Sequence, residues 1–200
     1  MSGVISHPDG LKRCHWPGTD PLYLDYHDKE WGVPELNDRA LFEKLVLDGF
    51  QAGLSWITIL RKRENFRKAF DGFDPEKIVR YKPARIEKLL QNEGIIRHRG
   101  KIEAVINNAR QARELIEREG SLAAFLWRYE PRPLARPQAV STSAESVALS
   151  RELKKRGWRF VGPTTVYAFM QAMGLVNDHA EGCIIRARVE KARKAFKRPG

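Results

Sequence analysis

The chain has 200 residues, with 36 lysines and arginines against 25 aspartates and glutamates, which gives a formal net charge of +11 at pH 7. Hydrophobic residues make up 42% of the sequence, enough for a buried core, and this excludes intrinsic disorder as the main state. No apolar run approaches the roughly 18 to 20 residues that span a bilayer, and residues 1–10 lack a signal-peptide layout. We therefore expect a cytoplasmic protein whose charge favours a nucleic-acid partner over an anionic membrane surface.

Apolar residues recur with helical spacing along the first 120 residues. Asn37 is a predicted N-cap for a helix over residues 39–50, and a second helix is expected over residues 55–70. A short helix begins at Pro83, and the clearest helical pattern covers residues 101–119. No segment shows a convincing period of two, so the predicted fold class is all-α.

The remaining residues predict a connector, two helices and a basic end. Three prolines in residues 129–141 indicate an extended connector, because proline interrupts helices. Residues 142–145 have a capping-box sequence for a helix that ends near Arg156, and an apolar helix is expected over residues 164–174. Residues 184–200 contain seven lysines and arginines and one glutamate. This basic tail is either a helix or a mobile arm, and either a solvated end or a DNA contact.

One carboxylate stands out in an apolar segment. Residues 45–60 contain Asp48 as their one charged side chain. A carboxylate there loses hydration, so its pKa rises unless a cation or hydrogen-bond donors hold it charged. A structural role, as a cap after Gly49 or as the partner of an arginine, is one interpretation. Trp56 and Tyr26 favour a binding site instead, because a carboxylate beside large aromatic faces suits a cationic planar ligand.

A glycine-flanked turn over residues 93–101 joins two predicted helices. Backbone N–H groups and the positive end of the second helix can face a phosphate in such a turn. Arg97, Arg99 and Lys101 add charge at the same point, which suits sequence-independent contact with a DNA backbone. An ordinary helical hairpin with exposed basic residues is the alternative, and the sequence leaves both open.

The chain has two cysteines, which form no disulfide framework and are each a thiol or a metal ligand in a reducing compartment. His179 and Cys183 are four residues apart, so one helical turn can present both. Cys14 has His27 at a plausible spacing. Two cysteines and two histidines make a closed tetrahedral set for structural zinc, which would tie the two ends of the chain together. Buried free thiols and core histidines are the alternative.

Four longer motifs resemble the DNA-3-methyladenine glycosylase I family, which belongs to the helix-hairpin-helix glycosylase superfamily. They cover residues 23–34, 51–58, 94–102 and 160–179, in the family's order, within a likeness that spans about residues 14–183. The resemblance implies an all-α helix-hairpin-helix DNA glycosylase fold with the motif at about residues 84–119. It implies one domain over residues 1–183, followed by the basic tail over residues 184–200.

The resemblance also implies excision of 3-methyladenine from alkylated double-stranded DNA, by hydrolysis of the N-glycosidic bond of a flipped-out nucleotide. It implies one structural zinc ion per chain, bound by Cys14, His27, His179 and Cys183. No lysine stands out as a Schiff-base nucleophile in the pocket motifs, so we expect a monofunctional enzyme that uses water. We further expect a monomer with no obligate protein partner and no membrane contact.

Two alternatives remain open at this point. The first is a glycosylase of broader range that also removes other alkylpurines such as 3-methylguanine. The second is a catalytically inactive, zinc-stapled DNA-binding module, which would keep the hairpin and the basic surface. An RNA or membrane-surface binder would explain the charge but not the apolar segment with its one carboxylate.

The family's base pocket maps onto Tyr26, Asp48 and Trp56, the predicted catalytic residues, and Trp16 and Trp31 are predicted to bind the substrate with them. The family often has glutamate at the position of Asp48. Aspartate is shorter by one carbon–carbon bond, about 1.5 Å. A water molecule or a shifted helix is therefore expected to fill the gap between Asp48 and the base.

The predicted DNA-binding residues fall into two groups. Gly53 and Leu54 are the expected wedge, because an apolar side chain just before Trp56 suits unstacking of a base pair. The others lie in the hairpin and at the start of the helix over residues 164–174, and they are Gly94, Arg97, His98, Arg99, Gly100, Lys101 and Thr164.

Overall fold

The protein is mostly helical in the computed structural model, which describes residues 3–132, 136–138 and 140–199. The α-helices of these residues are α1 (Pro21–Lys29), α2 (Asp38–Gln51), α3 (Trp56–Ala69), α4 (Pro75–Ile78), α5 (Pro83–Leu90), α6 (Arg99–Glu119), α7 (Leu122–Trp127), α8 (Ala144–Lys155), α9 (Pro163–Ala172) and α10 (Ile184–Ala195). A 3₁₀ turn, η1 (Asp71–Phe73), follows α3. None of the described helices is both long and apolar enough to cross a membrane.

A small antiparallel sheet precedes the helices and corrects the expectation that the chain has no strands. Strand β1 (Val4–Ser6) pairs with β2 (Lys12–Cys14), with Val4 opposite Cys14. Each strand has three residues, which is too short for an alternating pattern to appear in the sequence. The sheet nevertheless matters for the site, because its last residue is Cys14.

The predicted helices begin close to the expected residues. The Asn37 side chain accepts a hydrogen bond from the backbone N–H of Ala40 and caps α2, as predicted. The capping box of α8 differs from the prediction, because Ser143 exchanges hydrogen bonds with Ser146 at 3.1 and 2.8 Å. A serine at the fourth position thus takes the part that the capping-box pattern assigns to glutamate.

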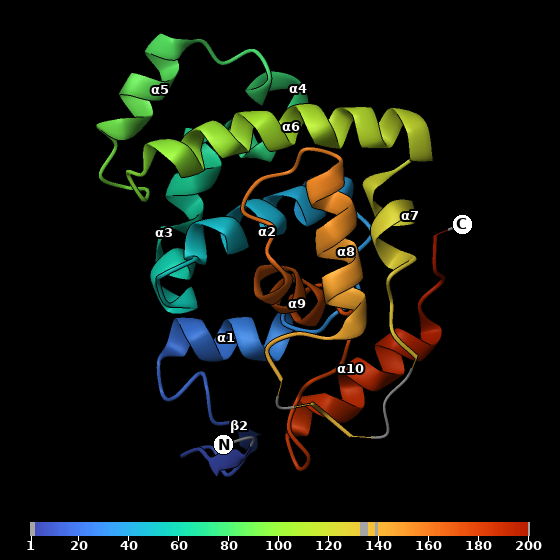
Figure 1. Ribbon diagram of the computed structural model, residues 1–200. Coiled ribbons are helices and arrows are strands. Elements are labelled where there is room, and N and C mark those ends of the chain that lie inside the picture. Colours follow the sequence, from blue (N-terminus) through green and yellow to red (C-terminus); the bar gives the residue numbers. More distant parts are fainter. Residues whose placement is uncertain (1–2, 133–135, 139, 200) are drawn as a thin grey trace.

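Helix α2 lies at the centre of the fold. Its residues 44–50 are all buried, and α3, α6, α7 and α9 pack around it. Figure 1 shows α6 across one side of the molecule with α4 and α5 beyond it, while α1 and α10 lie on the opposite side of α2 and α9. This arrangement places the Asp48 segment between the element predicted to bind DNA and the side that holds α1 and α10.

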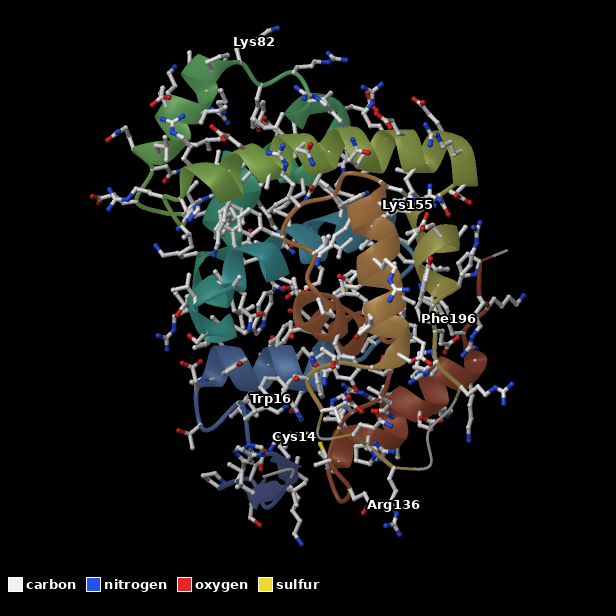
Figure 2. The ribbon with its side chains drawn as sticks, viewed as in Figure 1. Cys14, Trp16, Lys82, Arg136, Lys155 and Phe196 are labelled. Atoms are coloured by element: carbon white, nitrogen blue, oxygen red, sulfur yellow. The ribbon has the colours of Figure 1, made fainter. Side chains whose placement is uncertain are left out.

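The basic end folds as a helix over residues 184–195. Val189 is buried against the cluster that contains Cys14 and Cys183. Phe196 packs on Trp127 of α7, with ring centroids 4.3 Å apart (Figure 2). In the predicted connector, the described residues 129–132, 136–138 and 140–141 contain no helix, and residues 133–135 and 139 lie outside the described part.

Candidate active site

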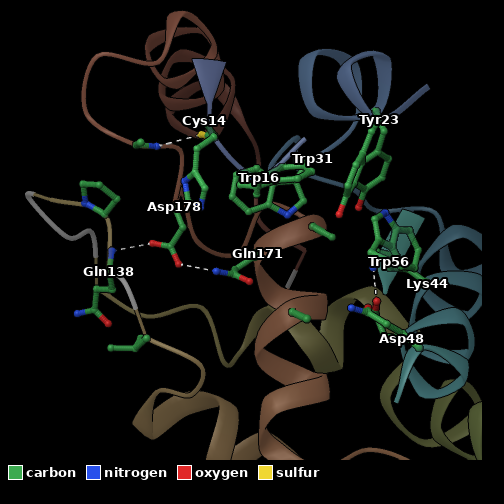
Figure 3. A pocket seen from close by; sticks show the side chains of 18 of the residues that line it. Cys14, Trp16, Tyr23, Trp31, Lys44, Asp48, Trp56, Gln138, Gln171 and Asp178 are labelled. Carbon is green, nitrogen blue, oxygen red and sulfur yellow. Dashed lines mark hydrogen bonds and ion pairs between the residues drawn. The ribbon is translucent and has the colours of Figure 1, made fainter. Parts of the chain in front are cut away.

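A cavity of about 370 Å³ lies between α1, α2, α3 and α9, beside the segment that follows β2. This volume falls in the range of small-molecule sites, about 300 to 1,000 Å³. All the residues predicted to bind the base line it, namely Trp16, Tyr26, Trp31, Asp48 and Trp56. Figure 3 shows Lys44, Asp48 and Trp56 on one side of the cavity and Asp178 and Gln138 on the other.

Aromatic side chains form a contiguous wall of the cavity. The ring of Trp16 meets Tyr23 and Trp31 edge to face, with centroids 4.9 and 5.1 Å away. Tyr26 and Trp56 are 5.5 Å apart and inclined by 46°. The indole N–H groups of Trp16 and Trp56 are buried and have no hydrogen-bond partner among the described residues. A planar ligand in this cavity would meet aromatic faces and two free donors.

Asp48 forms a buried ion pair that the sequence interpretation missed. Its side chain is on α2, is 2% exposed, and accepts a hydrogen bond through Oδ1 from Nζ of Lys44, one turn earlier. The ammonium also lies 3.7 Å from the ring centroid of Trp56. The predicted apolar segment begins at residue 45, one residue after Lys44. The spacing of four residues between the two charges was the signal that could have revealed the pair.

Burial and ion pairing have opposite effects on the pKa values of Asp48 and Lys44. Burial raises the pKa of Asp48 to about 6, although the ammonium of Lys44 acts in the other direction. Burial likewise lowers the pKa of Lys44, with Asp48 opposing it. Oδ2 of Asp48 is buried and lacks a hydrogen-bond partner in the described part of the chain. The carboxylate is therefore ionised at neutral pH and has one oxygen available to a ligand.

The opposite wall is polar, and the sequence did not indicate it. Asp178 accepts hydrogen bonds from the hydroxyl of Tyr167 at 2.6 Å and the amide of Gln171 at 3.0 Å through Oδ2. Its Oδ1 accepts from the backbone N–H of Gln138 at 3.0 Å. The cavity thus has two carboxylates in different surroundings, one desolvated beside a cation and one held by three neutral donors.

The predicted DNA-binding turn joins α5 to α6 over residues 91–98. His98 caps α6 by accepting a hydrogen bond from the backbone N–H of Lys101, and Gly100 lies in the first turn of this helix. Arg97 and Arg99 are exposed and pair with acidic side chains on the surface. Such exposed pairs contribute little, so both guanidinium groups can exchange their partners for phosphates.

The other predicted DNA-binding residues are Gly94 in the same turn, Thr164 at the start of α9, and Gly53 and Leu54 between α2 and α3. A Cβ on Gly94 would lie 3.0 Å from the side chain of Asn65, so this glycine allows the turn to pack on α3. Thr164 is exposed in the first turn of α9. Leu54 is 42% exposed in the turn between α2 and α3, directly after Gly53, which has a φ of 81°. A positive φ favours glycine, which allows this turn to present Leu54 to solvent.

Lys101 is not the exposed charge that the sequence interpretation expected. It is 8% exposed, and its Nζ donates to the carbonyls of Phe50 at 2.9 Å and Ala52 at 2.7 Å. These carbonyls belong to the end of α2, where an ammonium group satisfies free acceptors and the helix dipole. Lys101 therefore joins the first turn of α6 to the turn that carries Leu54.

Three of the four predicted metal ligands form a buried group. The ligand atoms of Cys14, His27 and Cys183 all lie within 4.8 Å of one another. Nε2 of His27 is 3.6 Å from Sγ of Cys183. A tetrahedral zinc ion with Zn–N near 2.0 Å and Zn–S near 2.3 Å would separate such a pair by about 3.5 Å. Figure 2 shows Cys14, the last residue of β2, on the side of the N-terminal sheet that faces α1.

His179, the fourth predicted ligand, lies beside this group but is not one of the three residues whose ligand atoms come together. Its ring centroid is 5.0 Å from that of His27. Each histidine is oriented through Nδ1, by Asp28 at 2.8 Å for His27 and by Asn177 at 3.1 Å for His179. Nε2 of His179 is buried with no partner in the described ranges. The donor set and the orientation of both rings fit a metal ion bound through Nε2.

Comparisons with known proteins agree with these observations. The family model for methyladenine glycosylases matches residues 16–187. DNA-3-methyladenine glycosylase 1 of Escherichia coli strain K12 is 51% identical over 180 residues, which cover 86% of this chain and 96% of that protein. The DNA-3-methyladenine glycosylase of Haemophilus influenzae is 48% identical over 177 residues, with the same coverage.

Solved structures of similar proteins have the same fold. A crystal structure of 3-methyladenine DNA glycosylase I (TAG) is 50% identical, covers 86% of this chain and 98% of its own, and superimposes with a TM-score of 0.82. The TAG of Staphylococcus aureus, solved to explain 3-methyladenine recognition, is 37% identical over 87% of this chain and 96% of its own, with a TM-score of 0.83. The resemblance of the four sequence motifs is thereby confirmed, and the chain belongs to the methyladenine glycosylase family.

Proposed function

We propose that the protein removes 3-methyladenine from alkylated double-stranded DNA by hydrolysing the bond between the base and the sugar. The observation that carries this proposal is the ionised, buried carboxylate of Asp48, which has one free oxygen on the wall of an aromatic cavity. The similarity to curated DNA-3-methyladenine glycosylases over 86% of the chain supports the same substrate.

The chemistry of 3-methyladenine explains why an aromatic pocket with one carboxylate is enough to select and release this base. Methylation at N3 gives the nucleotide base a positive charge, and this base leaves as a neutral molecule when the glycosidic bond breaks, so it needs little protonation. Tyr26 and Trp56 stack on the flipped base, and Asp48 complements the charge that an undamaged adenine lacks. The pocket therefore selects the lesion through electrostatic attraction and stacking.

Water is the proposed nucleophile, and the reaction has no lyase step. Lys44 is the only lysine among the described residues that line the cavity. Its amine donates a hydrogen bond to Asp48, whose charge opposes the effect of burial on the pKa of Lys44, and this pairing engages the amine as a donor rather than as a nucleophile. Asp48 is placed to stabilise the positive charge that develops on the sugar as the base departs.

DNA binding is assigned to the face that carries the turn between α5 and α6, which we propose to be a helix-hairpin-helix motif. Arg97 and Arg99 contact phosphates, together with backbone N–H groups at the start of α6. Leu54 fills the space that the flipped nucleotide vacates. Lys101 is not assigned to a phosphate, because it holds the turn of Leu54 in place from α6.

Replacing Lys101 by methionine is expected to slow base release from duplex DNA by about tenfold, as is Leu54→Ala, because both changes weaken the wedge without touching the pocket. The affinity for free 3-methyladenine, measured by quenching of tryptophan fluorescence, is expected to change less than twofold. Lys155→Met, on the exposed side of α8, serves as the control. An equal loss of free-base affinity in Lys101→Met would mean that Lys101 shapes the pocket instead.

We also propose that Cys14, His27, His179 and Cys183 hold one structural zinc ion. When bound, the ion supplies a cross-link between β2, α1 and the segment before α10. Two further features support the fit. The backbone N–H of Ala180 donates to Sγ of Cys14 at 3.3 Å, and a Cβ on Gly32, whose φ is 85°, would come within 3.0 Å of the His179 ring.

Chromatography of the bases released from methylated duplex DNA tests the proposed activity, with unmethylated DNA as the control. We expect release of 3-methyladenine, with 7-methylguanine left in the DNA. Release of 3-methylguanine at a similar rate would indicate the broader alkylpurine range. Binding of DNA without release of any base would contradict the proposal and favour an inactive DNA-binding module.

A further inference from the structure

Lys44 is the cation among the described residues of the pocket, and the proposed reaction leaves it without a role. It lies one helical turn before Asp48 on α2, and both side chains are buried, with 7% and 2% exposure. Its Nζ has two neighbours of note, Oδ1 of Asp48 and the face of Trp56 at 3.7 Å. A buried ammonium is costly unless it is paired, so this lysine needs a specific reason to be in the pocket.

The geometry divides the carboxylate into two different oxygens. Oδ1 accepts the hydrogen bond from Lys44, while Oδ2 is buried without a partner in the described part of the chain. Because the amine and the carboxylate are on the same helix, four residues apart, α2 itself sets their relative position. Figure 3 shows both groups on the same side of the cavity, next to Trp56.

We propose that Lys44 is a positioning residue for base release: it keeps Asp48 ionised inside the cavity and holds Oδ1, so that Oδ2 is presented to the base. This inference rests on the proposed function, because in it Lys44 keeps ionised and orients the carboxylate that recognises the lesion. It does not make Lys44 a nucleophile, since its Nζ is engaged in the hydrogen bond to Oδ1 of Asp48.

Other charged and titratable groups near the pair are engaged elsewhere, apart from Tyr26, whose pKa is raised by burial so that it carries no charge. They come from the elements around α2 and are Tyr26 of α1, Glu30 directly after α1, Arg63 of α3, Lys101 of α6, and Asp178, which follows α9. Arg63 and Glu30 form two hydrogen bonds with each other, at 2.6 and 2.8 Å. Lys101 donates to two backbone carbonyls, and Asp178 lies on the opposite wall with three donors of its own. Lys44 is therefore the cation that acts on Asp48.

Removal of Lys44 should change the pH dependence of the enzyme in a defined direction. Burial raises the pKa of Asp48 to about 6 while both contributions of Lys44, its charge and its hydrogen bond, lower it. Without Lys44 the pKa rises further, so the carboxylate is ionised only at higher pH. The wild-type rate is expected to fall as pH drops through about 6, and the rate of Lys44→Met to fall at least about one pH unit higher.

The test is the single-turnover rate of 3-methyladenine release between about pH 5 and pH 9, the range that covers both transitions. We expect Lys44→Met to approach the wild-type rate only at the alkaline end, and Lys44→Gln, which keeps a donor without the charge, to have a midpoint between the two. Lys29→Met is the matched control, because Lys29 pairs with Asp25 four residues away on the surface of α1. Superimposed profiles of wild type and Lys44→Met would overturn the proposal.

A second measurement separates this inference from the proposed function. Carbon-13 NMR of the aspartate carboxyl groups, with the Asp48 signal identified by its absence in Asp48→Asn, follows the titration without DNA or turnover. An upward shift of the Asp48 midpoint by at least about one pH unit in Lys44→Met is expected. An unchanged midpoint would overturn the role of Lys44 even if the enzyme is active. Absence of base release from wild type, with the midpoint shifted, would contradict the proposed function instead.

Discussion

Asp48→Asn is expected to lower the rate of 3-methyladenine release at neutral pH by a factor of about 100 to 1,000, the usual cost of removing one preorganised electrostatic contact from an active site. The substitution keeps the shape of the side chain and removes its charge. Lys44 keeps an acceptor in Oδ1 of the asparagine, so the fold is expected to survive. The measurement is single-turnover base release from methylated duplex DNA, with thermal unfolding as a check on the fold.

Two further variants show whether this loss comes from the carboxylate itself. Asp25→Asn also removes the aspartate of a lysine–aspartate pair on a helix, but on the surface, and its rate is expected to stay within about twofold of wild type. Trp56→Ala removes a stacking face, which typically costs about 1 to 3 kcal/mol per base, or about 5- to 150-fold. If Asp48→Asn released the base normally while Trp56→Ala did not, stacking alone would explain recognition.

The parts of this site that can be predicted from the sequence are those formed by residues close to one another in the chain. Asn37 predicts the start of α2, and the apolar segment around Asp48 predicts a desolvated carboxylate, which the structure has. Asp48 and Trp56 lie near the facing ends of two consecutive helices, so their closeness in sequence becomes closeness in space. The aromatic wall could be predicted for this reason and because the family motifs include its residues.

Other parts of the site depend on contacts between distant residues, which a single sequence does not encode visibly. The carbonyls that accept from Lys101 are 51 and 49 residues before it, so the sequence showed a basic residue but did not show that its ammonium is buried on two backbone carbonyls. The polar wall is similar, because Asp178 meets Gln138 across 40 residues of chain. For both Lys101 and Asp178, the sequence showed the type of residue but not its hydrogen-bond partner. Such partners decide whether a charge is free to bind a ligand.

Lys44 is a different kind of omission, since its partner is only four residues away. When the apolar segment is taken to start at residue 45, Asp48 is the one charged residue in it. Lys44, the residue just before the segment, is then overlooked, although its ammonium forms the ion pair with Asp48. The helical period relates the two, because residues four apart face the same side of a helix. A buried acid on a helix should therefore be examined together with residues one turn on either side.

Removal of zinc is expected to lower the stability of the protein far more than it slows base release by the remaining folded molecules. The proposed ligands join points that are 169 residues apart, and a cross-link that closes so long a loop stabilises by about 5 kcal/mol in the chain-entropy description. For a chain of this size, each kcal/mol shifts the unfolding temperature by about 2 to 4 °C. Chelation should thus lower that temperature by about 10 to 20 °C.

The matched variant is Cys183→Ser, which removes one ligand and leaves the other three in place. The unfolding temperature of this variant is expected to be low with or without chelator. Added zinc is expected to raise it less than it raises the unfolding temperature of the wild type, because three ligands bind the ion more weakly. Asp48 and Lys44 are bonded to each other rather than to the metal ligands, so the folded enzyme should keep its pH dependence after zinc is removed.

Metal analysis should find about one zinc ion per chain, since four ligands leave no open position on the ion. A protein that lacks zinc when freshly purified, or one whose unfolding temperature is indifferent to chelation, would show that Cys14, His27, His179 and Cys183 pack as ordinary core residues.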